Sequence, residues 1–406
     1  ELITLEDVLS IKFLGKWDWS PDGRFIAYIW DDGGIHDLWV VEPNVSGPRR
    51  VTRAKSGVTD FAWAPEGNEL WFIQDGSLCR IRACDENAEL ETLYTSTSKI
   101  SDLSCAPDGS TLAFLREGKI WLLNTRTGSF RETSLPGSCV SLGTPGCAAW
   151  NPSSLKFAFS FRDEETYRQI GLAGKDGNLI WRSFFDGPAT VLAWIDDNNL
   201  VFVRPEDGGT SARVMLLDTE KENPQLREVY RIKGSGRGPV LFTQLVVSPD
   251  RSKLLFLLEN DGWAHYYVMD REAALKGGQC SQSALKQVTF GNYEDFGHAG
   301  DQAAWWPDSG SFVYASNRKS RGERHLFRHY LDSGLDEEIV SLRGQNTMPK
   351  VSRRGKLAFV HCDAYRNMDI WVLEEAGPVQ VTFSMPPSWT EEKQYVPEEI
   401  SFESAG

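Results

Sequence analysis

The chain has 406 residues, of which 41% are hydrophobic and 25% are charged, and its formal net charge is −14. These proportions are typical of globular proteins and exclude a chain that is disordered throughout. The excess of acidic residues argues against a nucleic-acid-binding protein and against a polybasic surface that binds membranes.

The lack of a recognisable targeting signal and the pattern of cysteines together suggest a reducing compartment. No apolar run approaches the ~20 residues that span a bilayer, so we expect no membrane partner. The first four residues show no basic region followed by an apolar core, and we expect a cytoplasmic protein, although a signal peptide can have been removed before Glu1. Seven scattered cysteines without a Cys-x-x-Cys pair predict free thiols, with a Cys139–Cys147 disulfide as the alternative.

The chain begins with a predicted helical segment over residues 1–15. Thr4-Leu5-Glu6-Asp7 is typical of a capping box, in which the side chains of the first and fourth residues satisfy free backbone N–H groups. We expect a short helix through Leu14 that ends at Gly15.

A repeated unit fills residues 16–385. The chain holds 15 Trp, 21 Phe and 11 Tyr, and many of them end a short apolar strand that leads into a Ser/Ala-Pro-Asp/Glu-Gly turn and a second strand. In the first copy these parts are Trp17–Trp19, Ser20–Gly23 and Phe25–Tyr28, and a third strand follows at Asp37–Val41. Pro presets φ at the second turn position, and Gly is tolerant at the fourth. The eight copies are anchored at Pro21, Pro65, Pro107, Pro152, Asp196, Pro249, Pro307 and Arg353.

The spacing of these copies predicts an all-β fold. Consecutive anchors lie 42 to 58 residues apart, and four-stranded propeller blades typically repeat every ~40–50 residues. We predict a β-propeller of about eight four-stranded blades, with seven blades as the alternative. The sequence leaves open whether the N-terminal part lends a strand to the last blade or the ring closes by packing alone.

The C-terminal residues 386–406 depart from the repeat. They are rich in Pro and Glu and contain Ile400–Ser404, which has the character of a new strand. We interpret this segment as a linker followed by the first strand of a further domain.

No catalytic motif is recognisable. The chain contains no Gly-x-Ser-x-Gly elbow, no Gly-rich phosphate loop and no His-Glu-x-x-His pair. His325 and His329 share one face of a predicted strand, where solvated or hydrogen-bonded side chains are expected rather than a metal pair. We therefore expect no catalytic residue, no metal and no cofactor in this chain.

Two charged segments are candidates for binding. Arg162, Glu164 and Glu165 follow a predicted strand of the fourth blade, and paired carboxylates there can bind a cationic group such as a peptide amino terminus. Residues 317–324 occupy the same place in the seventh blade and can contact a partner domain. For both segments a solvated hairpin is the simpler interpretation.

The repeat resembles the propellers of two families. One is the N-terminal domain of prolyl oligopeptidase-type serine peptidases, including dipeptidyl peptidase IV-like and acylaminoacyl peptidase-like enzymes. The other is the TolB-like propeller of the bacterial envelope. Pro397–Ser404 favours the first family, because it resembles the strand that opens the α/β-hydrolase domain of these peptidases, although Ala405-Gly406 departs from the family's Asp-Gly pair.

The first resemblance implies that the chain is the propeller half of a serine peptidase, whose catalytic Ser, Asp and His lie in an α/β-hydrolase domain. It implies gating of access for short peptides, and an exposed apolar patch on the face where the hydrolase docks. Its partners would be that domain and short peptides, with a homo-oligomer also open. The alternatives are a stand-alone TolB-like scaffold that binds a protein or peptide, and a propeller enzyme with its site in the channel.

Overall fold

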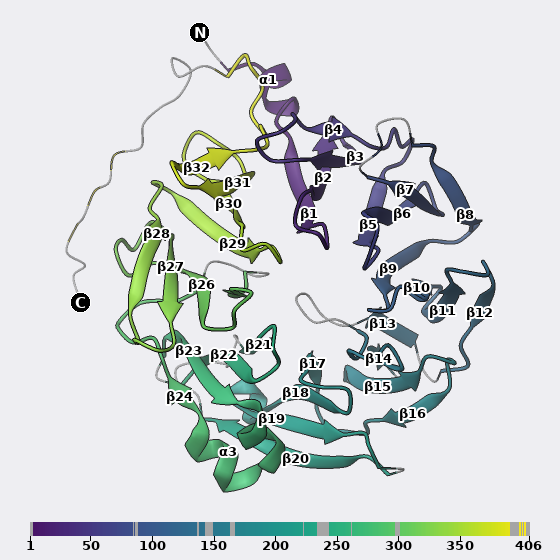
Figure 1. Cartoon of the computed structure of the whole chain (residues 1–406), viewed down its shortest axis with the longest axis vertical. Helices are drawn as coiled ribbons and strands as arrows, with labels where there is room; N and C mark the ends of the chain where they lie inside the picture. The colour runs from purple at the N-terminus through teal and green to yellow at the C-terminus, as the bar shows by residue number, and fades with distance from the viewer. Residues whose placement is uncertain are drawn as a thin grey trace.

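Eight four-stranded antiparallel sheets form the fold. The computed structural model describes residues 3–83, 85, 88–135, 138–142, 149–162, 167–221, 223–233, 243–260, 262–296, 301–389, 398, 400 and 402. Each sheet takes four consecutive strands from the chain, and the sheets stand around a ring as the blades of a propeller (Figure 1). The predicted all-β propeller is confirmed, with eight blades rather than seven.

The first strand of each blade lies nearest the centre of the ring, and the fourth forms its rim (Figure 1). Blades one to four comprise β1 (Phe13–Trp19), β2 (Ile26–Asp32), β3 (Ile35–Val41), β4 (Arg49–Arg50); β5 (Val58–Trp63), β6 (Glu69–Gln74), β7 (Ser77–Arg82), β8 (Glu91–Thr95); β9 (Ile100–Cys105), β10 (Thr111–Arg116), β11 (Lys119–Asn124), β12 (Phe130–Glu132); and β13 (Ser138–Leu142), β14 (Lys156–Arg162), β15 (Gln169–Gly174), β16 (Leu179–Arg182). Blades five to eight comprise β17 (Thr190–Trp194), β18 (Asn199–Glu206), β19 (Ser211–Asp218), β20 (Gln225–Ile232); β21 (Thr243–Val247), β22 (Lys253–Glu259), β23 (Ala264–Asp270), β24 (Lys286–Gln287); β25 (Ala304–Trp305), β26 (Ser311–Ser316), β27 (His325–Tyr330), β28 (Asp336–Val340); and β29 (Gln345–Val351), β30 (Leu357–Cys362), β31 (Asp369–Glu374), β32 (Gly377–Gln380). The short helices are α1 (Leu5–Leu9), η1 (Asp207–Gly209), α2 (Arg271–Lys276) and α3 (Gly278–Ala284).

The repeated turn is held by its own side chains. In blade one, Ser20 Oγ accepts a hydrogen bond from the backbone N–H of Phe25 at 2.9 Å and donates to Asp22 Oδ1 at 2.6 Å. Asp22 Oδ1 also accepts from the N–H of Arg24 at 3.0 Å, and Gly23 has a φ of 69°. The motif therefore closes the hairpin between the first and second strands with bonds that a single-residue change breaks.

The aromatic residue that ends the first strand links neighbouring blades. The indole N–H donates to a backbone carbonyl on the first strand of the preceding blade or beside it in three cases: Trp63 to Asp18 at 3.3 Å, Trp194 to Ala149 at 3.0 Å, and Trp305 to Val246 at 3.1 Å. Since an indole N–H that is withdrawn from water needs a partner, this bond sets the blade against the one before it at these three junctions.

The ring closes by packing, without a shared strand. The last blade consists of β29 to β32 alone, and Trp19 of blade one donates its indole N–H to the carbonyl of Lys350 at 3.0 Å. Lys350 Nζ in turn donates to the carbonyl of Trp17 at 2.6 Å. Trp17 and Tyr28 share one apolar cluster with Val360 and other residues of blade eight. The seam therefore uses the same Trp contact as the junctions at Trp63, Trp194 and Trp305.

The N-terminal helix is shorter than the sequence suggests. The capping box is present, with Thr4 and Asp7 each accepting from the other's backbone N–H, but α1 ends at Leu9. Gly15 lies within β1 and does not end the helix, so that part of the prediction is wrong. The apolar residues after Leu9 follow the strand alternation of blade one, where Trp17 and Trp19 are buried.

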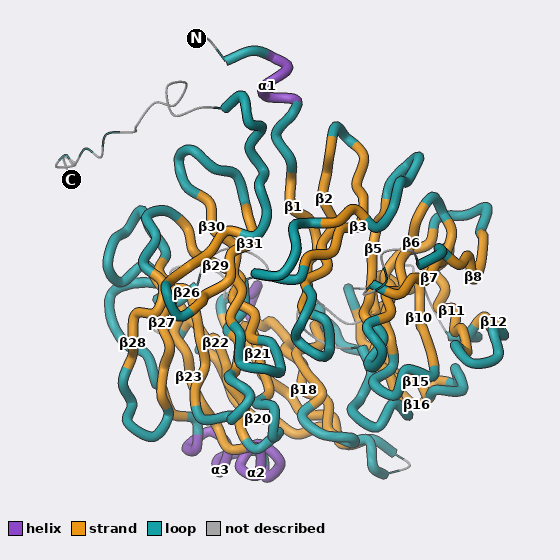
Figure 2. The backbone as a smooth tube through the Cα atoms, turned by 45° about the horizontal axis from the view of Figure 1, so that its top comes forward, coloured by secondary structure: helices purple, strands orange, loops and turns teal. Residues whose placement is uncertain are grey.

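The two faces of the ring carry different connections. Because all blades run in the same direction, the turns after the first strands lie on one face, together with α2 and α3 (Figure 2). The hairpins between the second and third strands, the links between blades and α1 lie on the other face. We call these the turn face and the terminal face. The exit segment, residues 381–389, also lies on the terminal face beside α1.

Candidate functional site

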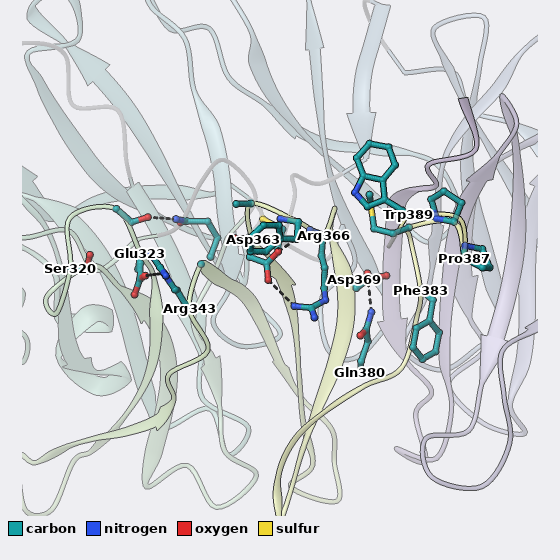
Figure 3. Close-up of a pocket in the computed structure, with 18 of the residues that line it drawn as sticks. Ser320, Glu323, Arg343, Asp363, Arg366, Asp369, Gln380, Phe383, Pro387 and Trp389 are labelled. Carbon is teal, nitrogen blue, oxygen red and sulfur yellow. Dashed lines mark hydrogen bonds and ion pairs between the residues drawn. The ribbon is translucent and has the colours of Figure 1, made fainter. Parts of the chain in front are cut away.

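A large cavity lies on the terminal face between blades seven, eight and the exit segment. Its volume is about 1070 Å³, and Figure 3 shows its side chains. The hairpin residues 320–323 and 362–366, the blade link around Arg343 and the exit segment contribute its walls. The hairpins that form it are longer than the two-residue hairpins of blades one to three. The long spacing between the second and third strands of blades seven and eight is the signal in the sequence that points to this cavity.

The polar wall of this cavity holds two internally paired arginines. Arg366 Nη1 lies 2.8 Å from Asp363 Oδ2, and Arg343 Nε lies 3.4 Å from Glu323 Oε1 (Figure 3). The side chain of Arg343 is 75% exposed, so that its pairing with Glu323 is weak in water. Within each pair the two charges balance, and each arginine keeps further N–H donors for a ligand's carbonyl or carboxylate groups.

Asp369, at the start of β31, closes the floor of the cavity. Its carboxylate accepts hydrogen bonds from Gln380 Nε2 at 3.1 Å, Thr382 Oγ1 at 2.9 Å, and the backbone N–H and Oγ of Ser384, each at 2.8 Å. Asp369 is 1% exposed, and this burial raises its pKa to about 6, although the hydrogen bonds act in the opposite direction. The carboxylate ties the exit segment to the last blade.

The apolar wall continues into an exposed surface at the two ends of the chain. The backbone N–H of Lys12 donates to the carbonyl of Ser384 at 2.9 Å, and Ser388 Oγ donates to Asp7 Oδ1 at 2.7 Å, so α1 and the exit segment lie together. Exposed apolar side chains gather on these two segments; we call them the terminal patch: Leu5, Val8, Leu9, Phe13 and Phe383. Leu5 is 74% exposed and Phe383 59%. The expected apolar patch is therefore present on one face.

A second cavity, of about 670 Å³, lies on the terminal face between blades four and five. Tyr167, Arg204, Glu206, Arg213 and Arg231 are among its lining residues. Arg213 Nε lies 2.6 Å from Glu206 Oε1, and Arg231 Nη1 lies 3.5 Å from Glu206 Oε2, so these charges are largely satisfied within the pocket wall.

The predicted binding residues of blade four adjoin this second cavity only in part. Arg162 is the exposed last residue of β14, and Tyr167, five residues on, lines the cavity. Glu164 and Glu165 lie outside the described residues. The proposed pairing of the Glu164 and Glu165 carboxylates therefore stays a prediction.

The charged segment of blade seven is not simply solvated. Arg318 Nη1 lies 2.8 Å from Asp336 Oδ2, and its guanidinium lies 4.2 Å from the centre of the Phe327 ring. The side chain is 14% exposed, and its carboxylate partners and the buried Tyr314 hold its pKa above the ordinary value despite the opposing effect of burial. For Arg318 the interpretation as part of a solvated hairpin is wrong, because its side chain folds back over blade seven.

The histidines of β27 are hydrogen-bonded. His325 Nδ1 lies 2.5 Å from Glu338 Oε1, and His329 Nδ1 lies 3.0 Å from Asp336 Oδ1. In the described part of the chain no group of three or more His, Cys, Asp or Glu side chains is placed to hold a metal ion. None of the helices that the structure describes is both long and apolar enough to cross a membrane.

The cysteines that the structure describes are free thiols: Cys79, Cys105, Cys139, Cys280 and Cys362. Burial raises the pKa of Cys139 to about 12, which makes this thiol unreactive. Its alternative disulfide partner, Cys147, lies outside the described residues, so the pairing is untested.

Comparisons with known proteins agree with the fold. Residues 186–368 match the family model of the dipeptidyl peptidase IV N-terminal region. The crystal structure of Porphyromonas gingivalis dipeptidyl peptidase 4 superposes with a TM-score of 0.70 over 99% of this chain and 65% of that chain, at 12% identity.

Two curated relatives match shorter stretches. The uncharacterized protein YidR of Escherichia coli (strain K12) is 34% identical over 76 residues, and the uncharacterized peptidase YuxL of Bacillus subtilis (strain 168) is 30% identical over 81 residues. Each match covers 18% of this chain, and they cover 18% and 12% of the respective relatives. Residues 186–368 are therefore similar to the dipeptidyl peptidase IV N-terminal region, and the likeness to the solved structure shows that the whole chain shares its propeller fold.

Proposed function

We propose that this propeller controls access of short peptides to the active site of a serine peptidase. The propeller is non-catalytic, and its partner is an α/β-hydrolase domain that carries the Ser, Asp and His residues. The single observation that carries the proposal is the terminal patch, which lies where the chain leaves the last blade. An exposed apolar surface of this kind marks a contact with another domain or protein.

The position of the cavities supports the gating role. Both open on the terminal face, so a hydrolase domain packed on the terminal patch would face them. A peptide in the larger cavity would meet Phe383 and Pro387 on one side and the donors of Arg343 and Arg366 on the other (Figure 3). Such mixed walls suit a short peptide, which offers both apolar side chains and backbone carbonyl groups.

The amino terminus of the peptide is assigned to blade four in this proposal. Glu164 and Glu165 would bind the ammonium group, with Arg162 orienting one of the carboxylates. Charge-assisted hydrogen bonds to two carboxylates are strong enough to favour peptides with a free amino terminus. The double change Glu164→Gln and Glu165→Gln would then raise KM for free peptides and leave KM for amino-blocked peptides unchanged.

The first experiment is to determine the coding sequence that follows Gly406. A reading frame that continues for about a domain length and contains a Gly-x-Ser-x-Gly elbow supports the proposal. A stop codon directly after Gly406 contradicts it and favours a peptide-binding scaffold.

The second experiment tests docking in the full-length protein. Leu9→Lys with Phe13→Lys charges the terminal patch, and Val45→Lys is the matched control, because Val45 is 73% exposed on the turn face. We expect the double variant to cleave a long polypeptide relative to a short peptide more readily than the wild type. An unchanged ratio of kcat/KM for the two substrates contradicts docking at this patch.

A further inference from the structure

The second cavity, between blades four and five, is lined by three arginines: Arg204, Arg213 and Arg231. Its volume of about 670 Å³ is in the range of pockets that bind small molecules. Glu206 lies between Arg213 and Arg231 and balances part of their charge. Arg204 has a different kind of partner, the carboxylate of Asp186 at the surface.

Arg204 is held in a fixed orientation but is only weakly paired. Its guanidinium lies 4.0 Å from the centre of the Phe185 ring, and that ring is stacked on Phe202. Arg204 Nη2 lies 2.9 Å from Asp186 Oδ1, where the Asp186 side chain is 96% exposed and that of Arg204 is 21% exposed. Since an ion pair with a carboxylate so open to water contributes little, another carboxylate can readily replace Asp186.

Two of the three arginines keep a buried N–H donor without an acceptor. The Nε atoms of Arg204 and Arg213 are buried and make no hydrogen bond, and among the described residues only Arg116 and Arg271 have an Nε of the same kind. Glu206 balances the charge of Arg213 without accepting from this N–H. A buried donor without an acceptor is costly, so a cavity with two of them favours a ligand that accepts hydrogen bonds.

The backbone beside Arg204 is fixed by a buried side chain. Gln169, which is 2% exposed, accepts from the N–H of Phe185 at 3.0 Å. Its Nε2 donates to the carbonyl groups of Phe185 at 3.1 Å and Gly187 at 3.3 Å. These bonds hold the blade link whose Phe185 ring supports the guanidinium. Because the donors are already in place, binding costs little conformational entropy.

The free edge of the Arg204 guanidinium matches a carboxylate. Nε and Nη2 form one edge of the planar group, and such an edge can bind both oxygens of a carboxylate. Asp186 uses Nη2 alone, which leaves the adjoining Nε without an acceptor. A ligand carboxylate in the place of Asp186 can use both donors.

The charge of the cavity favours a ligand with a single negative charge. Asp186, Glu206 and Asp207 line the cavity beside the three arginines. One carboxylate that replaces Asp186 at Arg204 keeps this balance. A doubly charged phosphate would add negative charge to a chain whose net charge is already −14.

We propose that this cavity binds a small organic carboxylate, whose two oxygens accept from Nε and Nη2 of Arg204. The ligand displaces Asp186 into solvent, and Phe185 keeps the guanidinium in place. The acidic side chain of a peptide and a free monocarboxylic acid share this chemistry. The site belongs to the propeller itself, so it does not depend on the proposed peptidase activity.

Isothermal titration calorimetry of this chain with three probes tests the site. The probes are the blocked peptide acetyl-Ala-Glu-Ala-amide, whose Glu side chain is its only carboxylate, the corresponding Gln peptide, and propionate. We expect the Glu peptide to bind about tenfold or more tightly than the Gln peptide. If propionate binds too, the carboxylate alone is sufficient, and if only the Glu peptide binds, the site takes acidic peptides. Both results support the proposal.

Two substitutions locate the binding at Arg204. Arg204→Gln should weaken binding of the Glu peptide by about tenfold or more, because it removes the charge and the paired donors. Arg126→Gln is the matched control, since Arg126 is exposed on a turn of blade three and its replacement removes the same charge. Asp186→Asn removes the competing carboxylate and should tighten binding by about threefold or more.

The thermal unfolding of Asp186→Asn should equal that of the wild type, because this side chain is almost fully exposed. If Arg204→Gln impairs folding, the affinity of Asp186→Asn decides, and an affinity equal to that of the wild type overturns the proposal. Binding of neither carboxylate probe at millimolar concentration overturns it as well. So does Glu-peptide binding that a folded Arg204→Gln leaves unchanged, or tighter binding of inorganic phosphate than of propionate.

Discussion

The turn face and the terminal face are made by the same strands, but they differ in regularity. On the turn face, blades close with the same bond from a serine hydroxyl to the aspartate two residues on, as at Ser20 and Ser248. On the terminal face, the hairpins range from Gly33-Gly34 in blade one to Asn317–Arg324 in blade seven. The face that repeats holds the fold together, whereas the face that varies carries the cavities and the terminal patch.

The largest expected effect is at the floor of the larger cavity. Asp369→Ala leaves the buried donors of Thr382, Ser384 and Gln380 without their acceptor, and we expect a loss of about 3 kcal/mol near pH 4, where the contribution of Asp369 is complete. Urea unfolding measures it. Asp332→Ala is the control, since this exposed carboxylate accepts from the neighbouring N–H of Ser333, and a loss of equal size in both variants would contradict the assignment.

A fall in pH should change the contributions of Asp369 on the terminal face and Asp250 on the turn face to folding stability in opposite directions. The pKa of Asp369 is raised to about 6, so its contribution to stability is complete below about pH 4 and is lost as pH rises through 6. Hydrogen bonds from Ser248 and Ser252 lower the pKa of Asp250 to about 2, so its contribution is present above about pH 4 and is lost as pH falls toward 2.

Unfolding free energies from pH 2 to pH 7 for Asp369→Asn and Asp250→Asn test these signs. We expect a difference from the wild type of up to about 3 kcal/mol for the buried Asp369 and below about 1 kcal/mol for the exposed Asp250. Parallel pH profiles for the two variants would refute the contrast between the faces.

Tight and long hairpins of the terminal face should differ in how well they tolerate the replacement of a glycine by alanine. Gly118 has a φ of 71°, and a Cβ there would lie 2.6 Å from Ser138 Oγ. Gly118→Ala should therefore cost about 2 kcal/mol. Gly322, in the long hairpin of blade seven, has open space around its Cβ position, and Gly322→Ala should be nearly neutral. Thermal unfolding distinguishes them, and equal melting temperatures would show that the tight hairpin is not strained by a side chain.

The smallest effect concerns the bonds between blades. Trp305→Phe removes the indole N–H that binds the carbonyl of Val246 but keeps an aromatic ring, and we expect a loss of about 1 kcal/mol from the hydrogen bond. The control is Trp150→Phe, because the Trp150 indole nitrogen has no hydrogen-bond partner in the structure. An equal loss in both variants would mean that ring volume, rather than this bond, stabilises the junction.

The blade count followed from the spacing of Pro21, Pro65 and their counterparts, because each hairpin needs the same local turn chemistry. The helix end was mispredicted because Gly15 is compatible both with a helix stop and with a strand, and only the pairing of β1 with β2 selects the strand. Arg318 was assigned to solvent because nothing local shows that its guanidinium reaches Asp336, eighteen residues away.

By itself, the sequence determined the repeat, the all-β class and the kind of turn, since these depend on contacts between residues near one another in the chain. The tertiary structure decided ring closure, the meeting of α1 with the exit segment, and the cavity between blades seven and eight. Those features join residues such as Asp7 and Ser388, which are far apart in sequence. They depend on how whole blades pack, which no local pattern encodes.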